Sequence, residues 1–385
     1  MSRGEGWGRE LGRLIAGHIF IHSTMAGVRM AAPLLVLEQG HGKAAVGVLV
    51  AFVALGQVLT ALPAGRLVHR HGVRLPLAWS AGAAIAAAVI AAVWPIYAAL
   101  CCSALLAGAA VGGVSVSMQF HVGRAAPDPA RLKQAFSWVS VSPAAANFLG
   151  PFAAGLMIDH LGFRAAFVLL GLLPAAAWFL VRTARSIPGE PAPAHETTGS
   201  AWDLWREPAF RRVLLMNWFM SASWDVHGFM VPVLGHERNL SASVIGTILG
   251  SFALAAAGIR LAMPFIVSRV REWVLMTATM TVTALLFWIY PLMPSALAMG
   301  LCSAGLGMAL ATVQPIVMSV LHQITPPHRH GEAMAMRLVT VSASNLAMPL
   351  LFGAVGGLLG ASAVFWTMGT IVGAGSRLAL AMRPP

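Results

Sequence analysis

Apolar stretches long enough to cross a membrane recur along almost the whole chain, and this feature limits the possible folds most strongly. They run from residue 12 to residue 382 of a chain of 385 residues, and about 20 apolar residues in a helix span the hydrocarbon of a bilayer. Only 10% of the residues are charged, whereas soluble domains carry about 25%. We therefore predict an all-α membrane protein, and we exclude a soluble enzyme and a disordered chain.

The apolar stretches predict twelve transmembrane helices. Their expected ranges are 12–36, 44–66, 74–93, 95–118, 135–158, 163–183, 209–234, 242–267, 272–290, 295–321, 332–355 and 360–382. A long polar stretch between the sixth and seventh helices contains SIPGEPAPAHETTGS, a composition typical of linkers. The sequence thus predicts an N-terminal six-helix half at 1–183, a cytoplasmic linker at 184–208 and a C-terminal six-helix half at 209–385.

Positive charge is distributed unevenly between the two sides of these helices. With a cytoplasmic N-terminus, most of the 25 Lys and Arg residues fall in cytoplasmic segments, and only Lys43, Arg164 and Arg238 fall outside. The positive-inside rule then predicts that both termini lie in the cytoplasm. We expect a multi-pass protein of a bacterial-type inner membrane. The net charge of +12 is scattered over short loops, which argues against binding to nucleic acid. The first apolar stretch is too long for a cleavable signal peptide.

The two halves carry related sequences, which indicates an internal repeat. The first half contains NFLGPFAAGLMIDHLGFRAAF, and the second contains NLAMPLLFGAVGGLLGASAVF. Four types of residue recur in register, namely Asn147, Pro151, Gly155 and Phe167 in the first half and Asn345, Pro349, Gly353 and Phe365 in the second. Parallel repeats of this kind are typical of secondary transporters, which bind substrate near the membrane midplane and work by alternating access. Chance similarity between glycine-rich helices is the alternative.

Two motifs resemble signatures of the major facilitator superfamily. GRLVHRHGVR is similar to the superfamily's loop signature G-x-x-x-D-R-x-G-x-R, except that His replaces the acid, and GPFAAG is similar to a motif of its proton-coupled drug antiporters. The resemblance covers essentially the whole chain and implies the twelve-helix major facilitator fold. It also implies gating roles for Gly65, His69, Arg70, Gly72, Arg74, Gly150, Pro151 and Gly155. A helix that contains Pro and Gly can pack closely and bend.

Asp225 is the only acidic residue in the interior of a predicted span, because the other acids lie in loops, in the linker or at span ends. Ionisable groups within the hydrocarbon are costly, so they are functional candidates by default. We predict that Asp225 carries the coupled proton. Arg29 lies at a similar depth in the first predicted helix, and protonation of Asp225 would weaken a pair between the two. A static ion pair is the alternative interpretation.

Further polar and aromatic residues inside the predicted spans are candidates for substrate binding. His22 and Arg29 share one helical stripe with His18, for which simple helix packing is favoured. Arg260 and Arg337 suggest an anionic group on the ligand, although both side chains could instead reach the lipid headgroups. The predicted binding set is His22, Arg29, Gln119, Asn147, Trp224, His227, Arg260, Gln314, Arg337 and Asn345. Several of them could equally hold helices together.

Two His-Arg-His tripeptides, at 69–71 and 328–330, lie in predicted cytoplasmic loops. If they meet, protonation of their imidazoles near pH 6.5 would loosen a cytoplasmic gate. A zinc site is a second possibility, and a solvated basic loop that obeys the positive-inside rule is the favoured interpretation.

The sequence as a whole predicts a proton-coupled secondary transporter for a small amphiphilic or anionic organic molecule, with export mildly preferred. The alternative is a proton-linked importer of an organic acid or a siderophore-like metabolite. The sequence contains no phosphate-binding loop, so we do not expect ATP to drive transport. No feature of the sequence favours an enzyme, a channel or a receptor. We expect a monomer without cofactor or metal that interacts with lipid, protons and substrate. Cys101, Cys102 and Cys302 lie in apolar runs and fit small buried hydrophobic residues.

Overall fold

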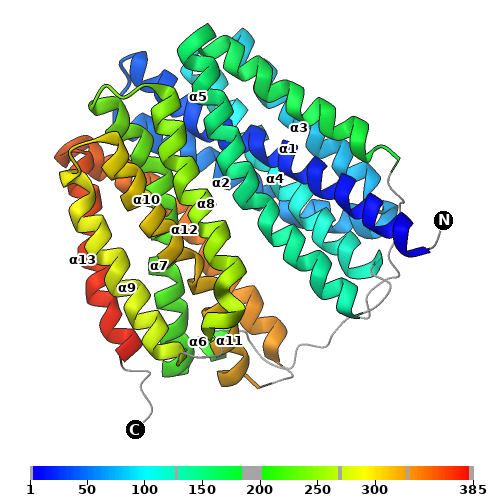
Figure 1. Cartoon of the computed structure of the whole chain (residues 1–385), viewed down its shortest axis with the longest axis vertical. Coiled ribbons are helices and arrows are strands. Elements are labelled where there is room, and N and C mark those ends of the chain that lie inside the picture. Colours follow the sequence, from blue (N-terminus) through cyan, green and yellow to red (C-terminus); the bar gives the residue numbers. More distant parts are fainter. Residues whose placement is uncertain (1–2, 126–128, 184–201, 268–270, 327–328, 381–385) are drawn as a thin grey trace. The chain divides into compact units, whose positions relative to one another are not determined.

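The computed structural model describes residues 3–125, 129–183, 202–267, 271–326 and 329–380, and their regular elements are all helical (Figure 1). This confirms the predicted all-α membrane class. Ten stretches of the described residues are long and apolar enough to cross a membrane. One of them, Val141–Val181, contains a bend, while the 30-residue helix that carries Asp225 is not among the ten. The count of twelve spans therefore stays a prediction.

The packing divides the chain into two compact units. The first comprises Met1–Pro193 together with Gly235–Gly250, and the second comprises Ala194–Leu234 together with Ser251–Pro385. The short segment Gly235–Gly250 thus packs with the first unit, although the chain on both sides of it belongs to the second. The predicted boundaries at 183 and 208 stay predictions.

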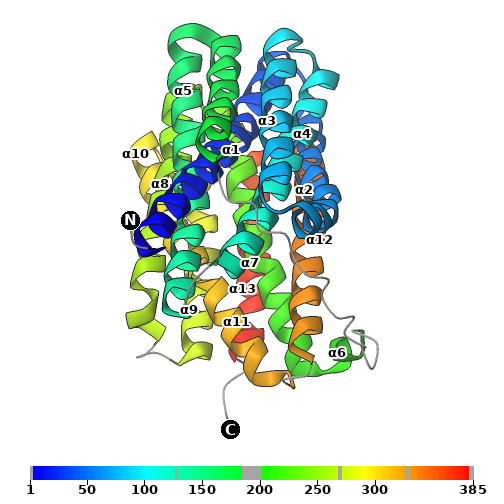
Figure 2. The ribbon, with the colours of Figure 1, turned by 90° about the vertical axis from the view of Figure 1, so that its right-hand side faces the viewer.

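The first unit is built from five long helices. They are α1 (Arg3–Glu38), α2 (Lys43–His71), α3 (Arg74–Val93), α4 (Tyr97–Ala125) and α5 (Pro129–Val181). Helix α5 corresponds to two predicted helices, and it is interrupted at Gly162, whose φ of 83° and ψ of 174° are not helical. Glycine adopts a positive φ without steric cost, so the chain bends here between the two predicted spans. Helix α1 packs along α5, and α2 packs along α4 (Figure 2).

The second unit contains the remaining elements. They are α6 (Trp202–Arg206), α7 (Pro208–Glu237), most of α8 (Ala242–Val267), α9 (Glu272–Ile289), η1 (Tyr290–Leu292), α10 (Ala296–Ala311), α11 (Val313–Ile324), α12 (His330–Leu359) and α13 (Ala361–Leu380). Helices α9 and α13 pack side by side, in yellow and red in Figure 1.

The predicted helix 295–321 is interrupted in the structure, where α10 ends at Ala311 and α11 begins at Val313. Pro315 has no N–H group and cannot donate to the carbonyl of Ala311. Thr312 turns inward, and its hydroxyl donates to the carbonyl of Ala309 at 2.8 Å. The loss of one backbone hydrogen bond beside a competing side-chain bond explains the break.

Candidate functional site

Asp225 lies on α7, and the structure brings it against Asn345 of α12 within the second unit. The carboxyl side chain is buried, with 7% of the residue exposed. With the Asn345 amide nitrogen turned towards the carboxylate, it donates to Oδ2 of Asp225 at 2.7 Å and to the carbonyl of Val341 at 3.1 Å. A buried carboxylate needs such donors, because an unpaired charge is costly away from water. Two residues of the predicted site therefore meet across two helices.

His227 lies two residues further along α7, on a different face of that helix. Its Nε2 is 2.9 Å from Oγ of Ser303 on α10, and that hydroxyl is 2.7 Å from the hydroxyl of Tyr290. The imidazole stacks on Phe252 of α8 with ring centroids 4.2 Å apart. His227 thus belongs to a buried network that joins α7, α8, η1 and α10. Its partners were not among the predicted site residues.

Trp224 and Arg260 extend this network along α8. The Trp224 ring meets Phe252 edge to face with centroids 4.7 Å apart. The guanidinium carbon of Arg260 lies 5.7 Å from the centre of the Trp224 ring, within the range of a cation–π contact. The ring therefore stabilises the Arg260 cation, for which the sequence suggests an anionic ligand.

The polar face of α1 forms a separate cluster in the first unit. His18 hydrogen bonds through Nδ1 to Ser142 at 2.8 Å and through Nε2 to Ser115 at 3.2 Å, which fits the favoured packing role. The His22 ring lies 5.6 Å from that of His18, and its buried Nδ1 has no hydrogen-bond partner among the described residues. Arg29 is partly exposed on the same helix. His22 therefore retains an unused polar atom that a ligand could engage.

The remaining predicted binding residues lie in three different settings. Gln119 and Gln314 are exposed. Asn147, the repeat counterpart of Asn345, donates to the carbonyl of Pro143 in its own helix at 2.8 Å. Arg337 is partly buried on α12, and its Nε has no hydrogen-bond partner among the residues that the structure describes.

An apolar cavity of about 520 Å³ lies in the second unit between α6, α7 and α12. Its lining residues are Trp205, Leu215, Trp218, Ala335, Met336, Val339, Thr340, Ala343 and Ala347. Thr340 carries the polar side chain of this set, and its hydroxyl donates to the carbonyl of Met336 at 2.8 Å. The volume suits a small organic ligand. The lining favours the apolar part of such a molecule.

The loop signature occupies the junction between α2 and α3. Gly72 ends α2 with a φ of 71°, and its N–H donates to the carbonyl of Val68 at 2.9 Å. Glycine is favoured at this backbone conformation. Gly65 lies inside α2, and the His69 ring meets Phe120 at 5.5 Å. Arg70 and Arg74 are exposed, at the end of α2 and the start of α3 respectively.

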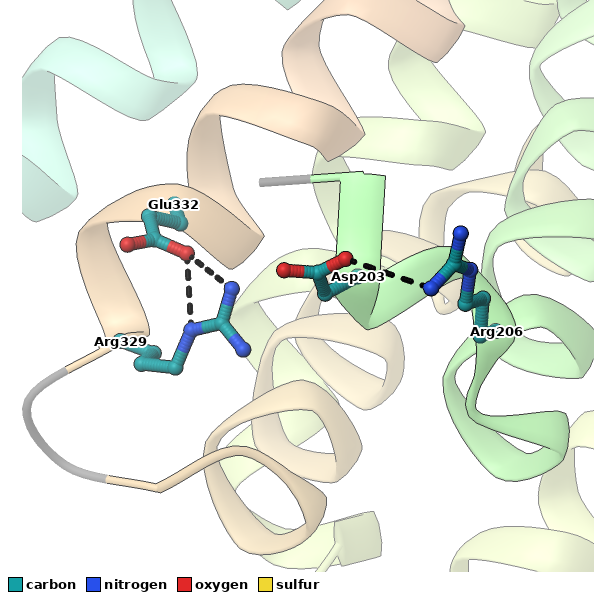
Figure 3. Close-up of polar contacts among 4 residues, drawn as sticks. All are labelled: Asp203, Arg206, Arg329 and Glu332. Atoms are coloured by element: carbon teal, nitrogen blue, oxygen red, sulfur yellow. Dashed lines mark hydrogen bonds and ion pairs between the residues drawn. The ribbon is translucent and has the colours of Figure 1, made fainter. Parts of the chain in front are cut away.

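The second His-Arg-His tripeptide ends at His330, the first residue of α12, and its first residue, His328, lies outside the described residues. Figure 3 shows Arg329 bound to Glu332, to which its Nε and Nη2 donate at 2.8 Å and 2.6 Å. Nε2 of His330 donates to the carbonyl of Thr325 at 2.9 Å. Asp203 and Arg206 of α6 form a second pair at 3.8 Å in the same view. The cationic charge of this loop is thus partly neutralised locally, and the pH gate and the zinc site stay predictions.

The GPFAAG motif forms backbone contacts on two sides of α5. A Cβ atom on Gly150 would lie 2.3 Å from the carbonyl oxygen of Ser23 on α1, and one on Gly155 would lie 2.4 Å from that of Ala242 on α8. Pro151 presents its own carbonyl to Gly246, where a Cβ would lie 2.4 Å away. Small residues allow helices in membranes to approach this closely.

The sequence is similar to a family profile and to a protein of known type. The family profile described as Major Facilitator Superfamily matches residues 14–299 and, in a second match, 213–385. An "MFS-type efflux pump" of Mycolicibacterium smegmatis (strain ATCC 700084 / mc(2)155) is 24% identical over 247 residues. That match covers 59% of this chain and 54% of the relative, so it spans about half the length of the relative.

Solved structures show the same fold at low sequence identity. A crystal structure of the nucleoside transporter NupG matches with a TM-score of 0.82 and 12% identity, over 98% of this chain and 100% of that one. A POT family transporter in complex with a thioalcohol-conjugated peptide matches with a TM-score of 0.78 and 14% identity, over 97% and 96% of the two chains. These likenesses concern the fold alone. The profile match over most of its length shows that the chain belongs to the Major Facilitator Superfamily.

Proposed function

We propose that this major facilitator transporter couples proton movement to the transport of a small amphiphilic or anionic organic molecule by alternating access. The observation that carries the proposal is the buried Asp225 carboxyl group, held by the amide of Asn345 between α7 and α12. Protonation would remove the charge that this amide stabilises. The α7–α12 contact would then differ between the protonated and ionised states, as coupling requires.

The amphiphilic character of the substrate is argued from two neighbouring features of the second unit. The cavity between α6, α7 and α12 offers an almost entirely apolar surface. Arg337 of α12 follows the lining residue Met336 directly, and its Nε lacks a partner among the described residues. A ligand with an apolar body and a carboxylate or phosphate would use both features, since guanidinium groups bind such anions with directed hydrogen bonds.

Export is the preferred direction, and an inner-membrane monomer with both termini in the cytoplasm is the preferred state. The relative from Mycolicibacterium smegmatis is named an efflux pump, and GPFAAG is similar to an antiporter motif. Proton-linked import of an organic acid or a siderophore-like metabolite remains the second candidate. It is favoured by the cationic and histidine side chains His22, Arg29 and Arg337, which suit a hydrophilic anion.

Flux measurements in proteoliposomes test this proposal. Purified protein is reconstituted, a pH gradient of either sign is imposed, and uptake of a panel of anionic amphiphiles, cationic amphiphiles and small organic acids is followed. We expect saturable, gradient-dependent flux of one anionic or amphiphilic class. Flux that does not saturate would indicate a channel, and the absence of flux for every class would contradict the proposal.

A further inference from the structure

The apolar cavity of the second unit is elongated along α12. Its lining residues on this helix include Met336, Thr340, Ala343 and Ala347, whose spacing of three or four residues places them on one face. At a rise of about 1.5 Å per residue, the first and last of them lie about 16 Å apart along the helix axis. The Thr340 hydroxyl is already bonded to a carbonyl of its own helix. This wall is therefore an apolar stripe, and we call the cavity the slot.

Helix α7 supplies the opposite wall of the slot. Leu215 and Trp218 are three residues apart, so they share one face of α7. Arg211 lies one turn before Leu215 on the same face, and it is exposed. Trp205 lines the slot from α6, three residues before α7 begins. The end of the slot at the start of α7, which the sequence predicts to be cytoplasmic, thus carries an aromatic ring and a cation.

Positive charge predominates at this end of the slot. Arg337 follows the lining residue Met336, and neither Arg337 nor Arg211 has an acidic partner among the residues that the structure describes. Where α6 meets α7, Glu207 and Arg212 add one charge of each sign. The nearby acids of α6 and α12 are each bound to an arginine close in the chain, namely Asp203 to Arg206 and Glu332 to Arg329 (Figure 3).

The slot has the dimensions and the polarity of one lipid chain with its head. The hydrocarbon of one leaflet is about 15 Å thick, half of the about 30 Å of a bilayer, and the apolar stripe on α12 has a similar length. Tryptophan and arginine are the residue types that lie at the level of lipid headgroups. The cytoplasmic leaflet is also the one that carries anionic lipids.

We propose that the substrate is an amphiphile with one extended alkyl chain and an anionic head. The slot binds the chain, and Arg211 and Arg337 bind the head. The inference rests on the transport function proposed above and names the substrate class of its apolar cavity. A fatty acid and a lysophospholipid share this chemistry and differ in the head, which is a carboxylate in one and a phosphate in the other.

Thermal unfolding of the purified protein in detergent, without any pH gradient, tests this substrate class. Alkyl phosphates from hexyl to octadecyl phosphate are compared with fatty acids and with uncharged alkanols of the same chain lengths. Each compound partitions into the detergent micelle equally for every variant. Differences between variants in the rise of the melting temperature therefore report binding in the slot.

The length of the chain that still gains affinity is the main readout. For the wild type we expect apparent affinity to rise about three- to fourfold per added methylene group and to level off near the dodecyl chain, whose extended length matches the slot. Ala347→Phe fills the inner end, so affinity should level off at a shorter chain. Ala343→Phe, at an exposed position in the middle of the slot, should shorten this limit further. It also replaces Ala347→Phe if that variant does not fold.

Matched controls accompany the variants of the chain site and of the head site. Ala354→Phe lies at an exposed position of α12 beyond the slot, and it should keep the wild-type limit. Arg211→Gln should weaken binding about two- to fivefold at every chain length, the size of an exposed ion pair. Arg271→Gln, at an exposed position before α9, should bind as the wild type. Stronger binding of phosphates supports a lysophospholipid as the source, and stronger binding of carboxylates supports a fatty acid.

Three results would each overturn the proposal. They are an unchanged chain limit in both Ala347→Phe and Ala343→Phe, unchanged affinity in Arg211→Gln, and equal affinity for dodecyl phosphate and dodecanol. The measurement involves neither flux nor proton movement, so these results would leave proton-coupled transport of another substrate class in place. Conversely, loss of coupling through Asp225 would leave the dependence on chain length intact.

Discussion

At the scale of single residues, the two repeat-related asparagines have different surroundings. Asn345 donates to Asp225 on another helix, whereas Asn147 donates to a carbonyl of its own helix. We expect Asn345→Ala to lower the free energy of unfolding by about 1.5–3 kcal/mol, because a charged acceptor loses a donor. Asn147→Ala serves as the matched control and should change it far less. Thermal unfolding in detergent measures both, and equal effects would contradict the assigned role of Asn345.

The arginines allow a second test at this scale. Arg337→Ala and Arg29→Ala should weaken binding of an anionic substrate by about 1.5–3 kcal/mol, because each removes a charge-assisted hydrogen bond. Lysine at either position should restore binding only in part, since it lacks the planar guanidinium group. Arg70→Ala, at an exposed loop position, is the control. Titration calorimetry with the substrate identified by flux decides the question, and unchanged affinity in both alanine variants would exclude an anion site there.

The sequence identified Asp225 because an acid within a span is costly, and the repeat identified Asn345. It did not identify Ser303, Tyr290 or Phe252 as the partners of His227. These three residues approach His227 only through the packing of different helices, and no spacing along the chain encodes such a contact. The contact of Arg260 with the Trp224 ring could not be predicted from the sequence either, because it depends on how α7 and α8 pack.

At the scale of helices, the contact between α5 and α8 makes a specific prediction about glycines. Gly155→Ala or Gly246→Ala should lower the free energy of unfolding by about 1–3 kcal/mol, since a Cβ would overlap a carbonyl group and force the backbones apart. Gly258→Ala is the control, because a Cβ at this position of α8 would meet nothing within 4 Å. Thermal unfolding with circular dichroism measures the difference. The close contact would be refuted by Gly155 and Gly246 variants as stable as the control.

Most helix positions could be predicted from apolar length alone. The ranges of α3 and α8 agree with the predicted 74–93 and 242–267. The break between α10 and α11 could not be found in this way, because the apolar run continues through Thr312 and Pro315. A single proline within a span is an ambiguous signal, since neighbouring groups can satisfy the backbone that it frees.

At the scale of the whole molecule, the internal repeat predicted two halves, and the structure contains two compact units. The assignment of Gly235–Gly250 to the first unit could not be predicted. It depends on hydrogen bonds from the backbone N–H groups of Ala242 and Ser243 to Asp159 and on glycine contacts between residues far apart in the chain, whereas the repeat describes only what the two halves share. Asp159 itself was overlooked, because it lies in an expected loop and these hydrogen bonds appear only when α8 is beside it.

The central claim is that transport and proton movement are coupled through Asp225. The most direct test follows the pH inside proteoliposomes with a trapped fluorescent dye while substrate is added outside. The wild-type protein should move protons whenever it moves substrate. Asp225→Asn should move no protons and accumulate no substrate against a gradient, yet should still exchange labelled for unlabelled substrate. Asp203→Asn, at an exposed position of α6, should behave as the wild type. Proton movement and accumulation at wild-type levels in Asp225→Asn would contradict the claim.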